Sequence, residues 1–506
     1  MQLAMQCRQL RGMMQVLANR RKVSNWLALA IVAIVGWMVA QGYFLWLGVL
    51  GFTAALAFCL VRPIWASSLV LSFAFINPSL LPPVMELGEF TVRYVDGATF
   101  LLIATIFLRL LVQRYTVFEQ EWWVIFKPLF PFLTYIGLSL GLVWIYVPDV
   151  LLASIASYVR LMITILTGLL ICISIKKEKD LRFITKVIIM LAVASITIGS
   201  WEALIVPRKE MLIISRYGGI LGYNTFGLVA GLLVLWSIIA YANRKPLLLW
   251  VIPLSSGLLG LFLSKSASSI LATVGGVLFF QAIFARKGLP QSTKVLKLVL
   301  GVIVGLVFTI WIIWLLRPAD LVGLVNLSGG SWAQRLMIAY AALQIFFAHP
   351  IFGVGWQASS TKAVIGDSAF NEELMRVFSQ LPRHYFFVER PTSLHNMYLQ
   401  FLAELGIIGF LLFTYGVIRI SKVVLKILRE IPPQHPFRQL ALFCAMGLIY
   451  LLIWWNTNPL YGGQTESMLA VGFLSLLAAL WKLQRQATNT KDSRTMDLSY
   501  KVPKRG

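Results

Sequence analysis

The chain has 506 residues, of which 59% are hydrophobic and only 13% are charged, and its net charge is +24. A soluble domain is about half apolar and about a quarter charged, so the composition excludes a water-soluble globular protein. The positive charge does not indicate a nucleic-acid-binding protein, because the basic residues lie in short runs between apolar stretches, as membrane topology requires.

Apolar stretches long enough to cross a bilayer, about 20 residues each, recur along the whole chain. We expect about fourteen such spans. A number from twelve to fourteen is possible, because the first three apolar stretches are closely spaced. The expected spans are 26–41, 43–61, 64–81, 96–113, 128–147, 158–175, 184–206, 221–242, 247–264, 266–285, 295–316, 396–420, 439–456 and 466–484. The sequence therefore predicts an all-α polytopic membrane protein.

The distribution of lysine and arginine predicts the orientation of these spans. Placing both termini in the cytoplasm puts most of the 44 basic residues inside, as the positive-inside rule demands. The longest outside segment then runs from Arg317 to His395 and contains an expected amphipathic helix, 332–347. Four parts follow: an N-terminal transmembrane bundle (1–316), a large periplasmic loop with short helices (317–395), C-terminal transmembrane helices (396–484) and a basic, disordered cytoplasmic tail (485–506).

Several outside cations have the chemistry to bind an anion. Arg335 lies near the start of the loop helix, and Arg216 precedes a glycine-rich turn in which Asn224 is positioned to cap the next helix. An arginine can bind phosphate through paired hydrogen bonds, but a snorkelling or exposed arginine is the alternative at both positions. Arg160, at the outer end of its span, and Lys265, between two spans, are charges close to hydrocarbon, which are often functional.

His395 ends the loop and begins the next span. Histidine exchanges a proton near neutral pH and can act as a general base, although a lone histidine at a helix start is more often a capping or interfacial residue. Glu404 lies nine residues further on, toward the opposite helix face, so an interhelical hydrogen bond or ion pair is expected for it. The four cysteines show no metal-binding or disulfide spacing, and we find no nucleotide-binding or metalloenzyme motif.

Three segments together resemble the family of O-antigen ligases and Wzy-type polysaccharide polymerases. They are the loop helix with Arg335, the turn His349-Pro350-x-x-Gly353-x-Gly355, and the segment from His395-Asn396 to Gly406-Ile407-x-Gly409. The resemblance is strongest over 330–410, and extends more weakly to Arg216 and to Ser264-Lys265-Ser266, where the family often has arginine in the place of the lysine.

This resemblance implies a bundle of the GT-C type in a bacterial inner membrane. It implies a glycosyltransferase that moves a glycan from an undecaprenyl-diphosphate-type carrier to a glycan or lipid hydroxyl, on the periplasmic side, without a metal or other cofactor. His395 would be the catalytic base, Arg335, Arg216, Lys265 and Arg160 would bind the diphosphate, and Asn396 and Glu404 would support the site. A one-step attack would invert the anomeric centre.

Two other functions remain open from the sequence. One is a transporter of an inorganic anion such as bicarbonate, although we find no inverted repeat and few charges within spans. The other is a non-catalytic component of a polysaccharide export complex. The sequence also does not separate a polymerase from a ligase, because the expected acceptor region, 357–391, has no readable motif.

Overall fold

The computed structural model describes most of the expected spans and part of the loop. The described residues are 44–75, 85–87, 90–92, 94–113, 120–205, 221–285, 331–359, 364, 368–379, 381, 386, 394–432, 435–460 and 465–499. The expected spans 26–41 and 295–316, and Arg216, lie outside these residues. By its internal contacts the chain divides into Met1–Arg62 and Pro63–Gly506.

Helices account for nearly all the described secondary structure. The first unit contains α2 (Phe44–Val61). The helices of the second unit are α3 (Ile64–Ala74), α4 (Tyr94–Gln113), α5 (Gln120–Phe126), η1 (Lys127–Leu129), α6 (Phe130–Tyr146), η2 (Pro148–Val150), α7 (Leu151–Ser174), α8 (Glu178–Ile205), α10 (Tyr223–Ala242), α11 (Leu248–Ser264), α12 (Ala267–Ala285), α15 (Ser331–Ala348), α17 (Ser368–Val377), α18 (Met397–Glu430), α19 (Arg438–Trp454), η5 (Trp455–Thr457) and α20 (Thr465–Ser499). This confirms the all-α membrane fold class.

The helix positions agree closely with the hydropathy pattern. Within the described residues, seven helices are long and apolar enough to cross a membrane, and five further apolar helices are shorter. The shorter ones include α11 and α12, which occupy two of the expected spans. The expected span 128–147 is covered by a continuous run of α5, η1 and α6. The last helix, α20, continues to Ser499, beyond the expected end of the last span.

One predicted span begins with a short helix. In the apolar run expected over 64–81, α3 ends at Ala74 with Phe75 as its C-cap, and residues 76–81 lie outside the described residues. A short antiparallel hairpin follows, in which β1 (Met85–Leu87) pairs with β2 (Phe90–Val92), with Met85 opposite Val92. Local hydropathy does not distinguish a full span from a shorter apolar helix, which explains the difference.

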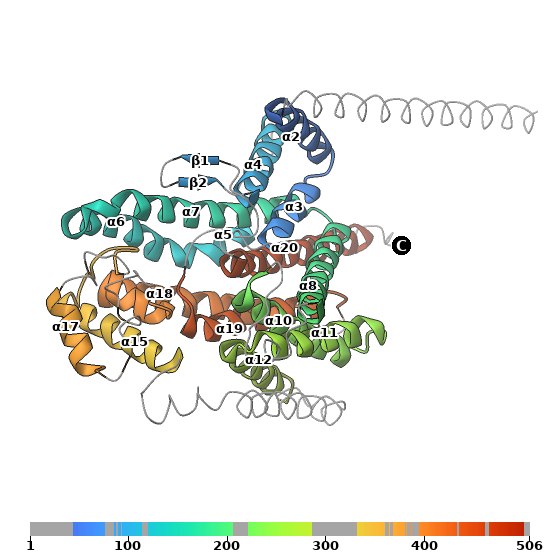
Figure 1. The fold of residues 1–506 in the computed structure, drawn as a ribbon. Coiled ribbons are helices and arrows are strands. Elements are labelled where there is room, and N and C mark those ends of the chain that lie inside the picture. The colour runs from blue at the N-terminus through green and yellow to red at the C-terminus, as the bar shows by residue number, and fades with distance from the viewer. Residues whose placement is uncertain are drawn as a thin grey trace, which may run out of the picture. The chain divides into compact units, whose positions relative to one another are not determined.

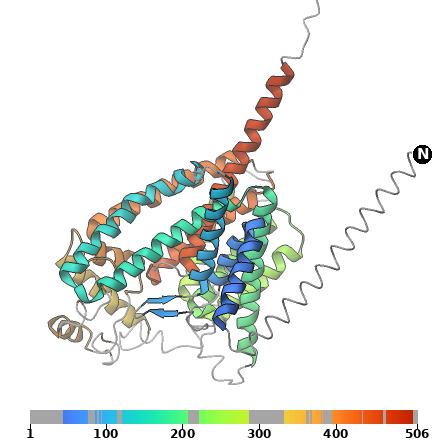
Figure 2. The same ribbon diagram turned by 90° about the horizontal axis from the view of Figure 1, so that it is seen from above.

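The second unit is a bundle whose core lies between the later helices. α10 packs against α11 and α12, α19 packs against α12 and α20, and α20 also packs against α7. α18 lies along α6 and is contacted by α15 from the loop. Figure 1 shows α15 and α17 at the end of the bundle where α6 connects to α7, and Figure 2 shows α20 projecting from the opposite end toward the C-terminus.

Candidate functional site

The helix that follows His395 begins with a well-formed cap. The Asn396 side chain accepts hydrogen bonds from the backbone N–H groups of Tyr398 (2.9 Å) and Leu399 (3.1 Å), which satisfies two of the donors at the start of α18. Its amide nitrogen donates to the Asn456 carbonyl oxygen at 2.8 Å. Asn396 therefore both starts α18 and ties it to η5. His395, immediately before the cap, has a left-handed backbone with φ +40°, which is uncommon for a residue with a side chain.

α18 has a kink at Gly406, where φ is +63° and ψ is −166°. In an unbroken helix, the N–H groups of Ile407 and Ile408 would donate to the carbonyls of Ala403 and Glu404. At the kink they donate instead to the carbonyls of two residues in the turn after α15, Pro350 (2.9 Å) and Ile351 (3.4 Å).

The two carbonyls that the kink releases are satisfied by the same turn. The N–H of Val354 donates to Ala403 (3.1 Å), and the N–H of Gly355 donates to Glu404 (2.8 Å). All four backbone groups released by the kink thus have partners in residues 350–355, which we call the kink turn. This exchange explains why a Pro/Gly turn and a glycine motif occur together in the sequence.

Glycine is required where these two backbones meet. A Cβ at Gly406 would meet the carbonyl of Ile351, and a Cβ at Gly353 (φ +71°) would meet the backbone of Glu404. Gly355 (φ +102°) faces α6 in the same way, because its Cβ would lie 2.8 Å from the Val143 nitrogen and 2.9 Å from the Ser139 oxygen. The positive φ angles and the close approach both exclude larger residues.

Glu404 is fully buried beside the kink turn. Its carboxylate accepts hydrogen bonds from the hydroxyl of Ser359 (2.6 Å) and the side-chain amide of Gln400 (3.2 Å), and it also hydrogen-bonds to the backbone of Gln357 and Ser359. These partners lie in the loop and in α18 itself. The expectation of a hydrogen bond is therefore met, but the bond links α18 to the loop rather than to another helix.

Gln400 extends this network to the segment after α19. Its side-chain oxygen accepts from the N–H of Leu460 at 2.9 Å, while the Gln357 amide donates to the Leu460 carbonyl at 3.4 Å. These hydrogen bonds thus hold together three segments near His395: the first turns of α18, the loop, and the segment after η5.

The charge of Arg335 acts on His395, although 59 intervening residues separate the two in sequence. Burial lowers the pKa of the His395 imidazole, and the positive charge of Arg335 lowers it further. Both effects disfavour the charged form, so the imidazole is neutral near pH 7 and available to accept a proton.

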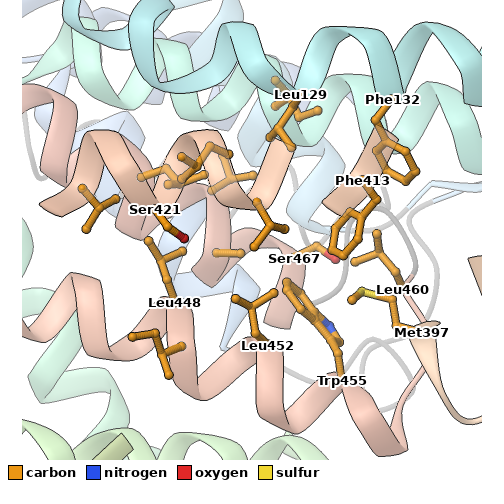
Figure 3. Close-up of a pocket in the computed structure, with 18 of the residues that line it drawn as sticks. Leu129, Phe132, Met397, Phe413, Ser421, Leu448, Leu452, Trp455, Leu460 and Ser467 are labelled. Atoms are coloured by element: carbon orange, nitrogen blue, oxygen red, sulfur yellow. The ribbon is translucent and has the colours of Figure 1, made fainter. Parts of the chain in front are cut away.

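An apolar cavity has Met397, two residues after His395, among its lining residues. Met397, Trp455 and Leu460 line one end, and Ser421 and Leu448 line the other (Figure 3). The cavity has a volume of about 290 Å³, and its lining is hydrophobic apart from Thr164, Ser421 and Ser467. It can hold a hydrocarbon chain whose polar end lies near His395.

Lys265 lies at the junction of α11 and α12, as expected. Its backbone is left-handed (φ +49°), and only 7% of the residue is exposed. The neighbouring hydroxyls form a buried cluster, in which Ser266 contacts Ser268 and Ser269 at 3.0 Å each.

Arg160 differs from its expected position. It lies inside α7, which begins at Leu151, rather than at the end of a span. Its guanidinium is 3.9 Å from the carboxylate of Asp96 in the first turn of α4. The expected Asn224 cap is also wrong, because α10 is capped by Gly222 (φ +70°) with no side-chain hydrogen bond.

Sequence reasoning missed several residues of the network around the kink. Ser359 and Gln357 bind Glu404, and the hydroxyl of Tyr135 donates to the Leu405 carbonyl at 3.2 Å. Trp356 is fully buried, and its indole N–H donates to Ser157 of α7 at 3.2 Å. A buried glutamate in a span signals that partners exist, but not which residues supply them.

Comparison with known proteins agrees with the motifs. Residues 251–414 match the family model described as O-antigen ligase. The match includes Lys265, Arg335, His395, the kink turn and the kink in α18. A search of curated proteins found no match.

With its several apolar helices, the chain is a multi-pass membrane protein, and about a third of it, residues 251–414, matches the O-antigen ligase family model. Residues 251–414 form an O-antigen ligase domain, which confirms the family that the sequence motifs resemble.

Proposed function

We propose that the protein transfers a glycan from a polyprenyl-diphosphate carrier of the undecaprenyl type to a hydroxyl acceptor, at the outer face of the inner membrane. The observation that carries this proposal is that His395, kept neutral by burial and by the charge of Arg335, lies two residues before Met397, which lines one end of an apolar cavity. A base, an anion-binding group and a hydrocarbon-binding cavity are the three elements that a lipid-linked sugar donor and a hydroxyl acceptor need.

The chemistry follows from these groups. The acceptor oxygen attacks the anomeric carbon as the bond from that carbon to the carrier diphosphate breaks. His395 takes the proton of the attacking hydroxyl. Arg335 stabilises the negative charge that develops on the departing diphosphate, which needs no metal for that purpose. One displacement inverts the anomeric centre.

The remaining cations are assigned to the same diphosphate with less direct support. Arg216 lies outside the described residues. Lys265 has the buried hydroxyl cluster beside it, and Arg160 already faces Asp96. Asn396 and Glu404 support the site by fixing the start of α18 and the kink turn against it.

The cavity supports a lipid-linked donor over a water-soluble one. Its volume of about 290 Å³ is at the low end of ligand pockets, which span roughly 300–1,000 Å³. It therefore accommodates only the part of the carrier tail nearest the diphosphate, and the rest of the tail lies in the bilayer.

Glycan transfer by the full chain in membranes tests this proposal. We expect His395→Ala and Arg335→Ala each to abolish transfer while the protein stays inserted at normal levels. His435→Ala is the matched control, because His435 lies in the turn before α19, and we expect it to transfer normally. Full transfer by both site variants would refute the proposal, and would leave an anion transporter or a non-catalytic export component.

The glycan profile of a deletion strain separates the two acceptor classes. Loss of long chains with one attached repeat remaining would identify a polymerase. Loss of every attached repeat with free polymer remaining would identify a ligase.

A further inference from the structure

From 335 onward, the most exposed residues of α15 and the kink turn are all apolar. Between 335 and 352, where every residue is described, the exposed residues are Leu336, Leu343, Phe347, Ala348, Pro350, Ile351 and Phe352. Phe347 is 68% exposed, and Ile351 and Phe352 are each 53% exposed. The opposite face, with Met337 and Ala341, is buried in the protein. The helix expected to be amphipathic therefore has apolar residues both at its buried positions and at its most exposed described positions, which is typical of a segment in contact with lipid.

The neighbouring helix of the same loop has the opposite character. α17 exposes Glu372, Glu373 and Arg376, and the Tyr340 hydroxyl of α15 donates to Glu373 at 3.1 Å. Two helices that touch each other thus present one charged surface and one apolar surface. This contrast is the pattern expected where water meets hydrocarbon.

The length of α18 gives a first estimate of depth. Its exposed residues are apolar from Ile407 to Ile418, and Arg419 is the first exposed charged residue. Gly406 precedes Arg419 by 13 residues, which is about 20 Å of helix. The hydrocarbon core is about 30 Å thick, so the kink lies within it, roughly 10 Å below the far boundary.

α6 gives an independent estimate. The Tyr135 hydroxyl donates to Leu405 at 3.2 Å and to Phe352 at 3.4 Å. Tyr135 follows the exposed Lys127 by eight residues, or about 12 Å of helix. The helix lengths counted along α18 and along α6 therefore both place Phe352 within the hydrocarbon.

The aromatic residues near the end of α6 mark the boundary itself. Trp144 and Tyr146 are 67% and 50% exposed, as expected for residues at a membrane interface. The ring of Tyr146 is 5.0 Å from that of His349. The imidazole of His349 therefore extends from the end of α15 toward the interface, while the apolar side chains of the residues after it lie deeper.

We propose that residues 335–352, expected from sequence to lie in a periplasmic loop, form a re-entrant element whose exposed face contacts acyl chains. α15 enters the leaflet opposite the basic end of α18, and the kink turn reaches the kink from within it. Irregular backbone is tolerated at this depth only when its polar groups have protein partners. The four hydrogen bonds between the kink turn and α18 meet that requirement.

The depth of the catalytic pair follows from the same geometry. His395 precedes Gly406 by 11 residues, on the side of the kink away from Arg419, which adds at most about 16 Å to the roughly 20 Å between Gly406 and Arg419. The charge of Arg335, at the other end of α15 from the kink turn, acts on His395. Both residues are therefore placed closer to the outer boundary than the kink is. This consequence rests on the proposed function only because that function identifies the ligand near these residues as a diphosphate. The proposal that residues 335–352 enter the membrane does not depend on glycan transfer.

Nitroxide labels on the full chain in liposomes of phosphatidylethanolamine and phosphatidylglycerol test the proposal. The labelled variants are Leu336→Cys, Leu343→Cys, Phe347→Cys and Ile351→Cys, with Arg376→Cys on α17 as the matched exposed control. The unmodified chain, treated with the same reagent, gives the background from the native cysteines. Collision rates with oxygen, which concentrates in the bilayer, and with a water-soluble nickel chelate then report the depth of each label.

We expect the labels at 347 and 351 to collide more with oxygen than with nickel, and the label at 376 to show the reverse. Depth should increase from 336 through 343 to 351. Nickel accessibility at 347 and 351 equal to that at 376 would overturn the proposal, because no other protein is present to cover the face. Equal, shallow depths at 336 and 351 would also overturn it, because they describe a helix lying flat on the surface. Neither result bears on the His395→Ala test, so the two proposals fail separately.

Discussion

Gly406→Ala tests whether the kink in α18 is held by the kink turn. The φ and ψ angles of Gly406, +63° and −166°, fall in a region that is essentially restricted to glycine, and occupying it with another residue costs about 1–3 kcal/mol. A methyl group there also meets the Ile351 carbonyl. The alternative is a straightened α18, which regains two helical hydrogen bonds but leaves four backbone groups of the kink turn without partners.

The smaller of these two costs determines the expected loss of stability. Leaving buried backbone groups unsatisfied costs about 1–3 kcal/mol each, partly offset by the two regained bonds at about 1 kcal/mol each. We therefore expect Gly406→Ala to lower the free energy of unfolding by about 2–4 kcal/mol. Glycan transfer should fall further than stability alone explains, since His395 and Arg335 are carried on the two segments that meet at the kink.

Thermal unfolding of the purified protein, followed by tryptophan fluorescence, measures the change. Gly141→Ala is the matched control, because Gly141 lies within α6 and a Cβ there meets nothing within 4 Å. Alanine in an unstrained helix is more stable than glycine by about 1 kcal/mol, so this control should unfold at the same or a slightly higher temperature. The reasoning is refuted if Gly406→Ala unfolds together with Gly141→Ala.

Three further predictions concern the site. Burial and the charge of Arg335 both lower the pKa of His395, so transfer should be full above that pKa and be lost as the pH falls through it, at a pH below the usual histidine value of about 6.5. A pH–rate profile of transfer checks this. In Arg335→Gln, histidine NMR should show that the pKa of His395 is raised. Asn396→Ala should cost about 1 kcal/mol of stability through the lost helix cap, whereas Asn396→Asp, which keeps the acceptor, should cost less in thermal unfolding. Glu404→Ala should cost about 2–4 kcal/mol by leaving buried donors without an acceptor, with Glu404→Gln intermediate, as denaturation of the two variants would show.

Much of the fold could be predicted because hydropathy is a local property. Spans such as 221–242 and 439–456 match α10 and α19 within two residues, since about 20 apolar residues have one stable conformation in lipid. The same local signal failed at 64–81, where it did not show that the helix ends at Ala74. It also did not show that Arg160 lies well inside α7.

The candidate site was only partly predictable. His395, Arg335 and the two glycine motifs are visible in the sequence as separate features. Their relation is not, because each partner is chosen by packing between distant segments: the kink turn pairs with a helix 50 residues later, and Ser359 is 45 residues from Glu404.

The sequence by itself determined that this is a multi-pass membrane protein with an O-antigen ligase domain, since composition, hydropathy and motif spacing are properties of the chain alone. Only the tertiary structure decided that the charge of Arg335 acts on His395, that the kink in α18 and the turn after α15 exchange their hydrogen bonds, and that the most exposed residues of α15 from 335 onward are apolar. The physical reason is that the packing of distant segments determines which groups a backbone amide or a charge contacts. The same packing determines whether an apolar side chain contacts protein or the surrounding solvent.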